Sequence, residues 1–110
     1  MRLVTALLAV ALVAACASHE PLSAPAERGR MIAQQNCSSC HAIGAAGESS
    51  APEAPPFRTL SANYRVGTLE EALAEGISVG HPAMPQFEFP PEDVDALIAY
   101  LESIQQPAQD

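Results

Sequence analysis

Apolar residues near the C-terminus follow a helical spacing more closely than those of any other stretch. They recur every three or four positions, at Val94, Leu97, Ile98, Leu101 and Ile104. This spacing places them on one face of an α-helix. Two prolines at positions 90 and 91 and two acids at 92 and 93 are typical of a helix N-terminus, where the helix dipole favours negative charge. We therefore expect a core-facing helix over about 90–104.

Two further helices are predicted upstream. Pro25 suits the first turn of a helix, and residues 26–36 continue without proline. Gly29 lies within this helix at a cost of about 1 kcal/mol relative to alanine, so either a second helix approaches closely there or the glycine is incidental. Residues 68–71 (TLEE) match a capping box. The short helix expected behind it carries Leu69, Ala72, Leu73 and Ile77 and ends at Gly76 and Gly80.

The stretch from Ala42 to Val66 is irregular. It is rich in glycine, serine and proline, with only Phe57, Leu60 and Tyr64 as spaced apolar anchors. A loop of this length is unusual inside a compact domain unless it surrounds a bound group. Because no stretch alternates convincingly with a period of two, we expect an all-α domain.

Length and charge narrow the classes of protein that fit. The chain has 110 residues, enough for one small domain, and carries 5 basic residues against 13 acidic ones, for a net charge of -8. All of the bases are arginine. Binding the backbone of a nucleic acid needs a basic footprint, so this balance argues against a nucleic-acid partner. A domain this small buries only a modest core, which a cofactor often completes.

The first 15 residues predict a secretory signal peptide. A single charge at Arg2 precedes an apolar run that ends at Ala15 and is too short to span a bilayer. Residues 15–17 (ACA) fit an ordinary cleavage site, which would leave the protein freely diffusible. Residues 13–16 (VAAC) instead resemble a lipobox, in which Cys16 is lipidated. We favour the lipobox, because an unpaired cysteine in an exported chain needs an explanation.

This reading divides the chain into four parts. Residues 1–15 are the signal peptide, residues 16–24 a flexible tether, residues 25–105 the folded domain and residues 106–110 a frayed tail. Export places the domain in the periplasm, either soluble or anchored by lipid to the membrane that faces it.

Candidate chemistry centres on residues 37–41 (CSSCH). Cys-x-x-Cys-His is the pattern at which a c-type haem is attached covalently. Cys37 and Cys40 lie within one helical turn, where both sulfurs can reach one edge of a porphyrin and form thioethers. His41 can then present an imidazole nitrogen to the iron. The motif therefore predicts a covalent haem c.

Two other uses of these cysteines fit less well. A zinc site needs four ligands, and the remaining ones would have to come from Cys16, His19 or His81 without the usual spacing. A thioredoxin-like dithiol expects a strand before the motif and a βαβ context, and neither is predicted.

A second iron ligand is available 43 residues after His41. Residues 81–85 (HPAMP) hold Met84 on a segment that the two prolines keep extended. Met31 lies only six residues before Cys37 and is poorly placed to reach the opposite haem face. Met84 is therefore the candidate distal ligand.

Three polar side chains around the long loop are candidates for holding haem propionates. Arginine offers a fork of donors to a carboxylate, and tyrosine a single hydroxyl. They are Arg58, Tyr64 and Arg65. Each one alone is about as well explained as an ordinary surface residue.

From residue 25 to about residue 105 the chain resembles the class I cytochromes c. The matching features are Gly29, the CSSCH motif, Met84 followed by Pro85, and residues 96–101 (ALIAYL) in the last helix. The resemblance implies that Cys37 and Cys40 hold the haem, that His41 is the proximal ligand and that Met84 is the distal one. It also implies that the first and last helices cross near Gly29 and Tyr100, and that a carbonyl of Pro55 or Pro56 supports His41.

The function implied is that of a monomeric single-electron carrier, not an enzyme, in a respiratory or photosynthetic chain. Its partners would be membrane oxidoreductase complexes or periplasmic dehydrogenases. The lysine ring familiar in the family is missing, so an acidic partner surface cannot be bound in that way. The alternative function is a haem-based gas-sensing or ligand-binding module in which Met84 is labile.

Mass spectrometry of the mature protein tests the motif and the leader together. We expect one haem in addition to the polypeptide mass, and an N-terminal Cys16 that carries acyl chains. A mass without haem would overturn the haem hypothesis, whereas an unmodified N-terminal Ser18 would identify the ordinary cleavage site.

Overall fold

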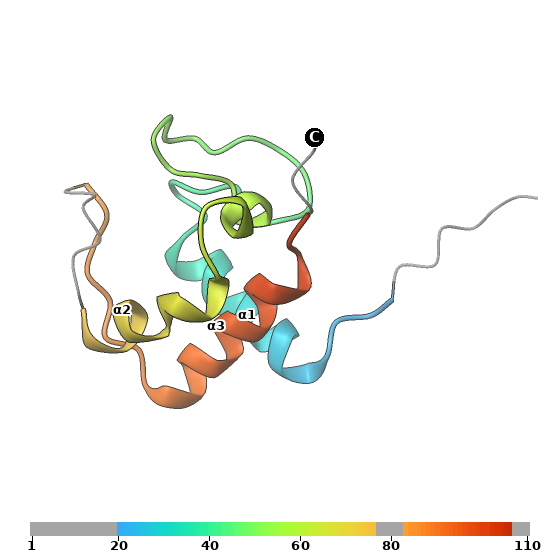
Figure 1. Cartoon of the computed structure of the whole chain (residues 1–110), viewed down its shortest axis with the longest axis vertical. Helices are drawn as coiled ribbons and strands as arrows, with labels where there is room; N and C mark the ends of the chain where they lie inside the picture. Colours follow the sequence, from blue (N-terminus) through green and yellow to red (C-terminus); the bar gives the residue numbers. More distant parts are fainter. Residues whose placement is uncertain (1–19, 77–82, 107–110) are drawn as a thin grey trace, which may run out of the picture.

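The computed structural model describes residues 20–76 and 83–106, and these form helices and loops without a strand. The helices are α1 (Ala24–Asn36), the 3₁₀ helices η1 (Phe57–Ala62) and η2 (Val66–Leu69), α2 (Glu70–Glu75) and α3 (Pro91–Ser103). Figure 1 shows α1 and α3 together at the centre, with α2 beside them and the loop that follows α1 on another side. The all-α prediction is confirmed. Cys16, His19 and His81 lie outside the described residues.

The first helix begins one residue before Pro25. Ser23 is its N-cap, and the Ser23 hydroxyl oxygen accepts a hydrogen bond from the Ala26 N–H at 3.3 Å. The helix ends at Asn36, where the Cys37 N–H donates to the Ala33 carbonyl at 2.8 Å. The cysteine motif therefore starts at the C-cap of α1.

Gly29 marks the place where α1 and α3 meet. A Cβ atom at this position would overlap the backbone carbonyl of Ala96 and lie 2.7 Å from the Cβ of Tyr100. Only glycine permits this approach of two backbones. Of the two explanations for Gly29, close packing against a second helix is the correct one, and Tyr100 is the aromatic residue at the contact.

The core is built mainly from the inner face of α3. Val94, Leu97 and Leu101 are each no more than 3 % exposed. Leu97 and Leu101 belong to one cluster with Phe57 and Leu60 of η1. Burial of apolar side chains is the dominant stabilising term in folding. The periodicity of the last helix thus identified its buried face correctly.

Two predictions of local structure need correction. Thr68 is not the N-cap of α2, because its hydroxyl donates to the Arg65 carbonyl at 2.6 Å and the residue belongs to η2. The loop from Ala42 to Val66 is not irregular throughout, since it contains η1. Gly76 does end α2, with φ 71° in the left-handed region. Ile77 and Gly80 lie outside the described residues.

None of the helices formed by the described residues has the length and apolar character needed to span a membrane.

Replacing Gly29 by alanine tests the contact between α1 and α3. Helix propensity alone would stabilise the protein by about 1 kcal/mol, but the new Cβ forces the backbones apart. We expect the free energy of unfolding to fall by about 2 to 3 kcal/mol, measured by denaturant titration.

The matched control is Gly44→Ala, because a Cβ at Gly44 meets nothing within 4 Å. This variant should stay within about 0.5 kcal/mol of the parent. Equal effects of the two substitutions would contradict the packing role of Gly29.

Candidate haem site

The CSSCH motif continues the turn at the end of α1. The N–H groups of Cys40 and His41 both donate to the Cys37 carbonyl, at 3.2 and 2.9 Å. These bonds keep residues 37–41 in a compact turn, as their spacing predicted. Both cysteines are half-buried free thiols.

A short segment of the following loop folds back onto this turn. The Ser49 hydroxyl accepts from the Ala42 N–H at 2.9 Å, and the Ser50 hydroxyl donates to the Ser39 carbonyl at 2.5 Å. The Ala51 N–H donates to the Cys40 carbonyl at 3.1 Å. The motif backbone is thereby held from two sides.

The orientation of His41 is set by a backbone carbonyl. The Nδ1 atom of His41 lies 2.8 Å from the Pro55 carbonyl oxygen. Because a carbonyl oxygen can only accept, Nδ1 carries the proton and Nε2 keeps a lone pair. The ring of Phe57 lies against the imidazole, with centroids 4.9 Å apart and the planes inclined at 44°. Of the two prolines that the sequence left open, Pro55 provides the acceptor.

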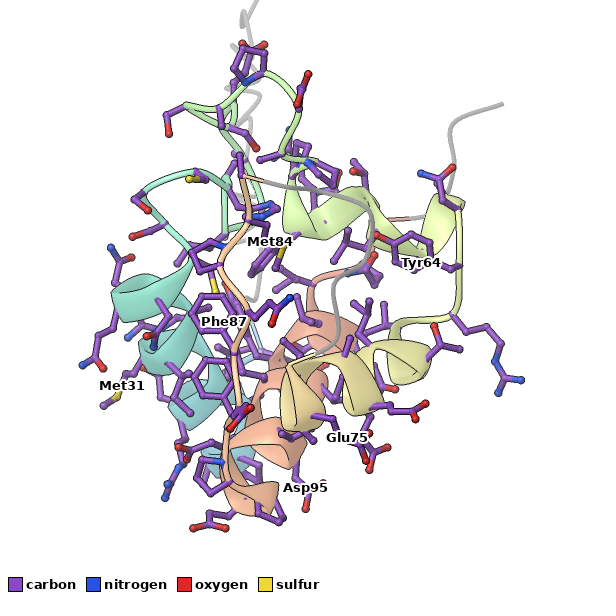
Figure 2. All side chains as sticks on the ribbon, turned by 90° about the vertical axis from the view of Figure 1, so that its left-hand side faces the viewer. Met31, Tyr64, Glu75, Met84, Phe87 and Asp95 are labelled. Carbon is purple, nitrogen blue, oxygen red and sulfur yellow. The ribbon has the colours of Figure 1, made fainter. Side chains whose placement is uncertain are left out.

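An apolar cavity of about 410 Å³ opens beside His41. Its size lies in the range of small-molecule and cofactor pockets. The lining comes from the motif, η1 and the residues that flank it, η2, α2, α3 and the segment before α3: Cys37, His41, Pro55, Phe57, Leu60, Tyr64, Thr68, Leu69, Ala72, Leu73, Met84, Pro85, Gln86, Phe87, Leu97 and Leu101. Figure 2 shows Met84 turned toward the interior, whereas Met31 points outward from α1.

No carboxylate, arginine or lysine is among the lining residues that the structure describes. Burial, followed by the nearby Cys40, raises the pKa of the Cys37 thiol to about 11. A charged group would be poorly stabilised in these surroundings, since burial of an unpaired charge is costly. The cavity therefore suits a largely apolar group.

The structure gathers some of the predicted site residues and separates others. Cys37, His41, Met84 and Tyr64 line the same cavity, and Cys40 lies next to it in the motif without being part of the lining. Arg58 instead donates to the Gly47 carbonyl at 2.7 Å. Arg65 borders a separate, more open hollow.

That second hollow lies behind η2. It is lined by Ser61, Arg65, Val66, Gly67, Thr68, Glu102 and Gln105. Arg65 and Glu102 make it more polar than the cavity beside His41.

Helix α3 also secures the loop that follows the motif. The Tyr100 hydroxyl donates to the Ile43 carbonyl at 2.6 Å, two residues after His41. Burial is the main cause that raises the pKa of Tyr100, with a smaller opposite effect of Arg30 and a further increase from Glu27. This tie was not predicted from the sequence, although the position of Tyr100 near the apolar stripe was a signal.

Two residues at the C-terminal end of the described chain also form hydrogen bonds with η1 and with the loop that follows the motif. Gln105 contacts η1, and the Gln106 side chain donates to the Ala45 carbonyl at 2.9 Å. The sequence placed residue 106 at the start of a frayed tail. In the structure it is hydrogen-bonded, and no local sequence signal marks these partners.

A family model described as "Cytochrome C oxidase, cbb3-type, subunit III" matches residues 24–101. The chain belongs to this family of c-type cytochrome domains. Such a domain carries a covalent c-type haem with its iron and is an electron-transfer module. The resemblance to the cytochromes c that the sequence indicated is confirmed. No curated protein and no solved structure matches the chain significantly.

The residues of this cytochrome domain fit a c-type haem. Cys37 brings a free thiol to the cavity wall, and Cys40 follows it in the same turn. His41 can offer the Nε2 lone pair because its proton lies on Nδ1, which donates to the Pro55 carbonyl. The remaining lining is mostly apolar, as suits a porphyrin.

Replacing Tyr100 by phenylalanine in the haem-loaded protein removes the bond to Ile43 and leaves a part-buried carbonyl without that donor. We expect the free energy of unfolding at pH 7 to fall by about 1 to 2 kcal/mol, measured in denaturant. Stability should also depend less on alkaline pH than in the parent.

The sign follows from the raised pKa of Tyr100, because the folded state holds this proton more tightly than the unfolded state. The contribution is complete below about pH 9 and is lost as the pH rises through the higher pKa of the folded state. Parent and Tyr100→Phe curves that stay parallel above pH 10 would contradict it.

Proposed function

We propose that this domain is a single-electron carrier with one covalent haem c, held between His41 and Met84. The observation that supports it is that both side chains line one apolar cavity beside Cys37. When bound, the haem supplies one-electron chemistry through an iron that changes between the ferrous and ferric states. The chain itself holds, orients and shields that group.

His41 is the proposed proximal ligand, and a backbone carbonyl and an aromatic ring hold its imidazole in place. The bond from Nδ1–H to the Pro55 carbonyl fixes the tautomer and increases the basicity of the other nitrogen. Phe57 limits rotation of the ring from one side. An imidazole held in this way would suit a ligand of the haem iron in both oxidation states.

Met84 is the proposed distal ligand. It lies on the extended segment before α3, which is tied to α2 where the Phe89 N–H donates to the Leu73 carbonyl at 3.0 Å. The other methionine of the domain, Met31, is 51 % exposed on α1 and does not line the cavity. Methionine raises the reduction potential relative to two nitrogen ligands, which suits a carrier late in an electron-transport chain.

The apolar wall shields the site from water. Leu97 and Leu101 of α3 are almost completely buried, and they line the cavity together with Leu60. A hydrophobic shell controls solvent access and local dielectric, and hence reduction potential. Such a wall suits electron transfer without a bound substrate.

Cys37 and Cys40 are the proposed thioether residues. For the propionates, Tyr64 is the best-placed candidate because it lines the cavity and remains 42 % exposed. Arg58 and Arg65 remain candidates, although the Arg58 guanidinium donates to the Gly47 carbonyl and Arg65 borders the second hollow.

The proposed setting is a periplasmic respiratory or photosynthetic chain, with Cys16 as a lipid anchor and the domain as a monomer. The family description names a cbb3-type oxidase, so a membrane oxidase is one proposed redox partner, and a periplasmic dehydrogenase is another. Arg28 and Arg30 are already paired with Asp93 and Glu27. The acidic excess therefore favours partners with a basic face.

Carbon monoxide tests the ligand assignment. We expect the reduced, haem-loaded protein not to bind it readily at pH 7, because Met84 fills the distal position. The variant Met84→Ala should bind it readily, as followed by the change in the haem absorption spectrum.

Met31→Ala is the matched control and should behave as the parent. Ready binding by the parent would favour the gas-binding alternative with a labile Met84. Unchanged behaviour of Met84→Ala would show that Met84 is not the distal ligand.

A further inference from the structure

Both the nitrogen and the oxygen of the Gln105 side-chain amide form hydrogen bonds to the backbone. Its nitrogen donates to the carbonyls of Phe57 and Leu101, at 2.7 and 2.8 Å. Its oxygen accepts from the Ser61 N–H at 2.8 Å. The residue follows the end of α3, so one amide joins that helix to η1.

Gln105 binds two backbone groups of η1 that could otherwise bind each other. The Phe57 carbonyl and the Ser61 N–H are four residues apart, and an α-helical turn would join them directly. A 3₁₀ helix pairs each N–H with the carbonyl three residues earlier, so the Phe57 carbonyl and the Ser61 N–H are not joined to each other, and the second lone pair of a carbonyl oxygen can accept from a further donor. The Gln105 amide lies between them. Its oxygen accepts from the Ser61 N–H, and its nitrogen donates to the Phe57 carbonyl. It thereby favours the 3₁₀ form of η1 over an α-helical turn.

The backbone of Gln106 reinforces this arrangement. Its N–H donates to the Arg58 carbonyl at 2.9 Å. The start of η1 is thus attached to the end of α3 through two successive glutamines.

The position of Phe57 bears directly on His41. The Phe57 N–H donates to the Ala42 carbonyl at 2.9 Å, and its ring lies 4.9 Å from the imidazole. Pro55, which accepts the Nδ1 proton, is two residues earlier in the same segment. A change in η1 would therefore move both the ring beside His41 and the carbonyl that orients it.

We propose that Gln105 is a positioning residue for the His41 imidazole, acting through Phe57 and the Pro55 carbonyl. The proposal rests on the proposed role of His41 as an iron ligand. Without the amide, the Phe57 carbonyl and the Ser61 N–H can pair with each other, and the segment from Pro55 to Phe57 shifts. The bond from Nδ1–H to Pro55 then weakens, which makes the imidazole a less basic ligand and disfavours the ferric state.

The test uses the haem-loaded protein and the neutral, similarly sized substitution Gln105→Met. We expect faster solvent exchange of the His41 Nδ1 proton, altered NMR shifts of the His41 ring and a midpoint potential higher than that of the parent. The matched control is Gln106→Met, which removes one bond to the Ala45 carbonyl and leaves the bonds of Gln105 in place. It should lower thermal stability without moving these three observables.

A second variant, Gln105→Asn, keeps the amide but is one methylene shorter, and it should shift the three observables in the same direction. It replaces the methionine variant if that protein does not fold. Unchanged His41 signals and potential in the folded Gln105 variant, with only a lower melting temperature, would overturn the proposal and leave a structural role.

Failure of the proposed function is recognised separately. In that case the parent protein itself would show no covalent haem by mass spectrometry, or no signals of an iron-bound His41. Neither result depends on Gln105.

Discussion

The contact between the backbones of α1 and α3 at Gly29 is the constraint on which the rest of the structure depends. Helices usually pack through side chains that interdigitate, but here a main-chain carbonyl of Ala96 lies where a Cβ would be. This contact sets the position of α1 against α3, and α1 ends at the cysteine motif. It therefore also decides that Leu97 and Leu101 form a wall of the cavity that Cys37 borders.

Outside the helices, hydrogen bonds between side chains and the backbone hold the loop after α1 in place, as pairing between strands would in a sheet. Ser49 and Ser50 hold the loop against the motif, Tyr100 holds the Ile43 carbonyl, and Gln106 holds the Ala45 carbonyl. Backbone groups outside regular structure need other partners, and here they come from the loop itself, from α3 and from the C-terminal end of the described chain. Four side chains from three parts of the chain thus give a loop of glycine, serine and proline one defined course beside the CSSCH motif.

The helices and the CSSCH turn could be predicted because their signals are local: apolar periodicity, proline at helix starts and a rare motif. The capping box failed because Thr68 is equally able to bond the Arg65 carbonyl and does so in η2. The choice of Pro55 and the bridge made by Gln105 could not be predicted. Gln105 and Phe57 are 48 positions apart, and a pairing over that distance leaves no pattern in one sequence.

The burial of Cys37 has a consequence for the order of assembly. A thiol with a pKa of about 11 is present as thiolate in only about one molecule in ten thousand at pH 7, and the thiolate is the reactive form of cysteine. In this half-buried position Cys37 is a poor nucleophile at neutral pH. The proposed thioether at Cys37 would therefore form more readily from an arrangement in which this thiol is less buried than it is in the folded chain.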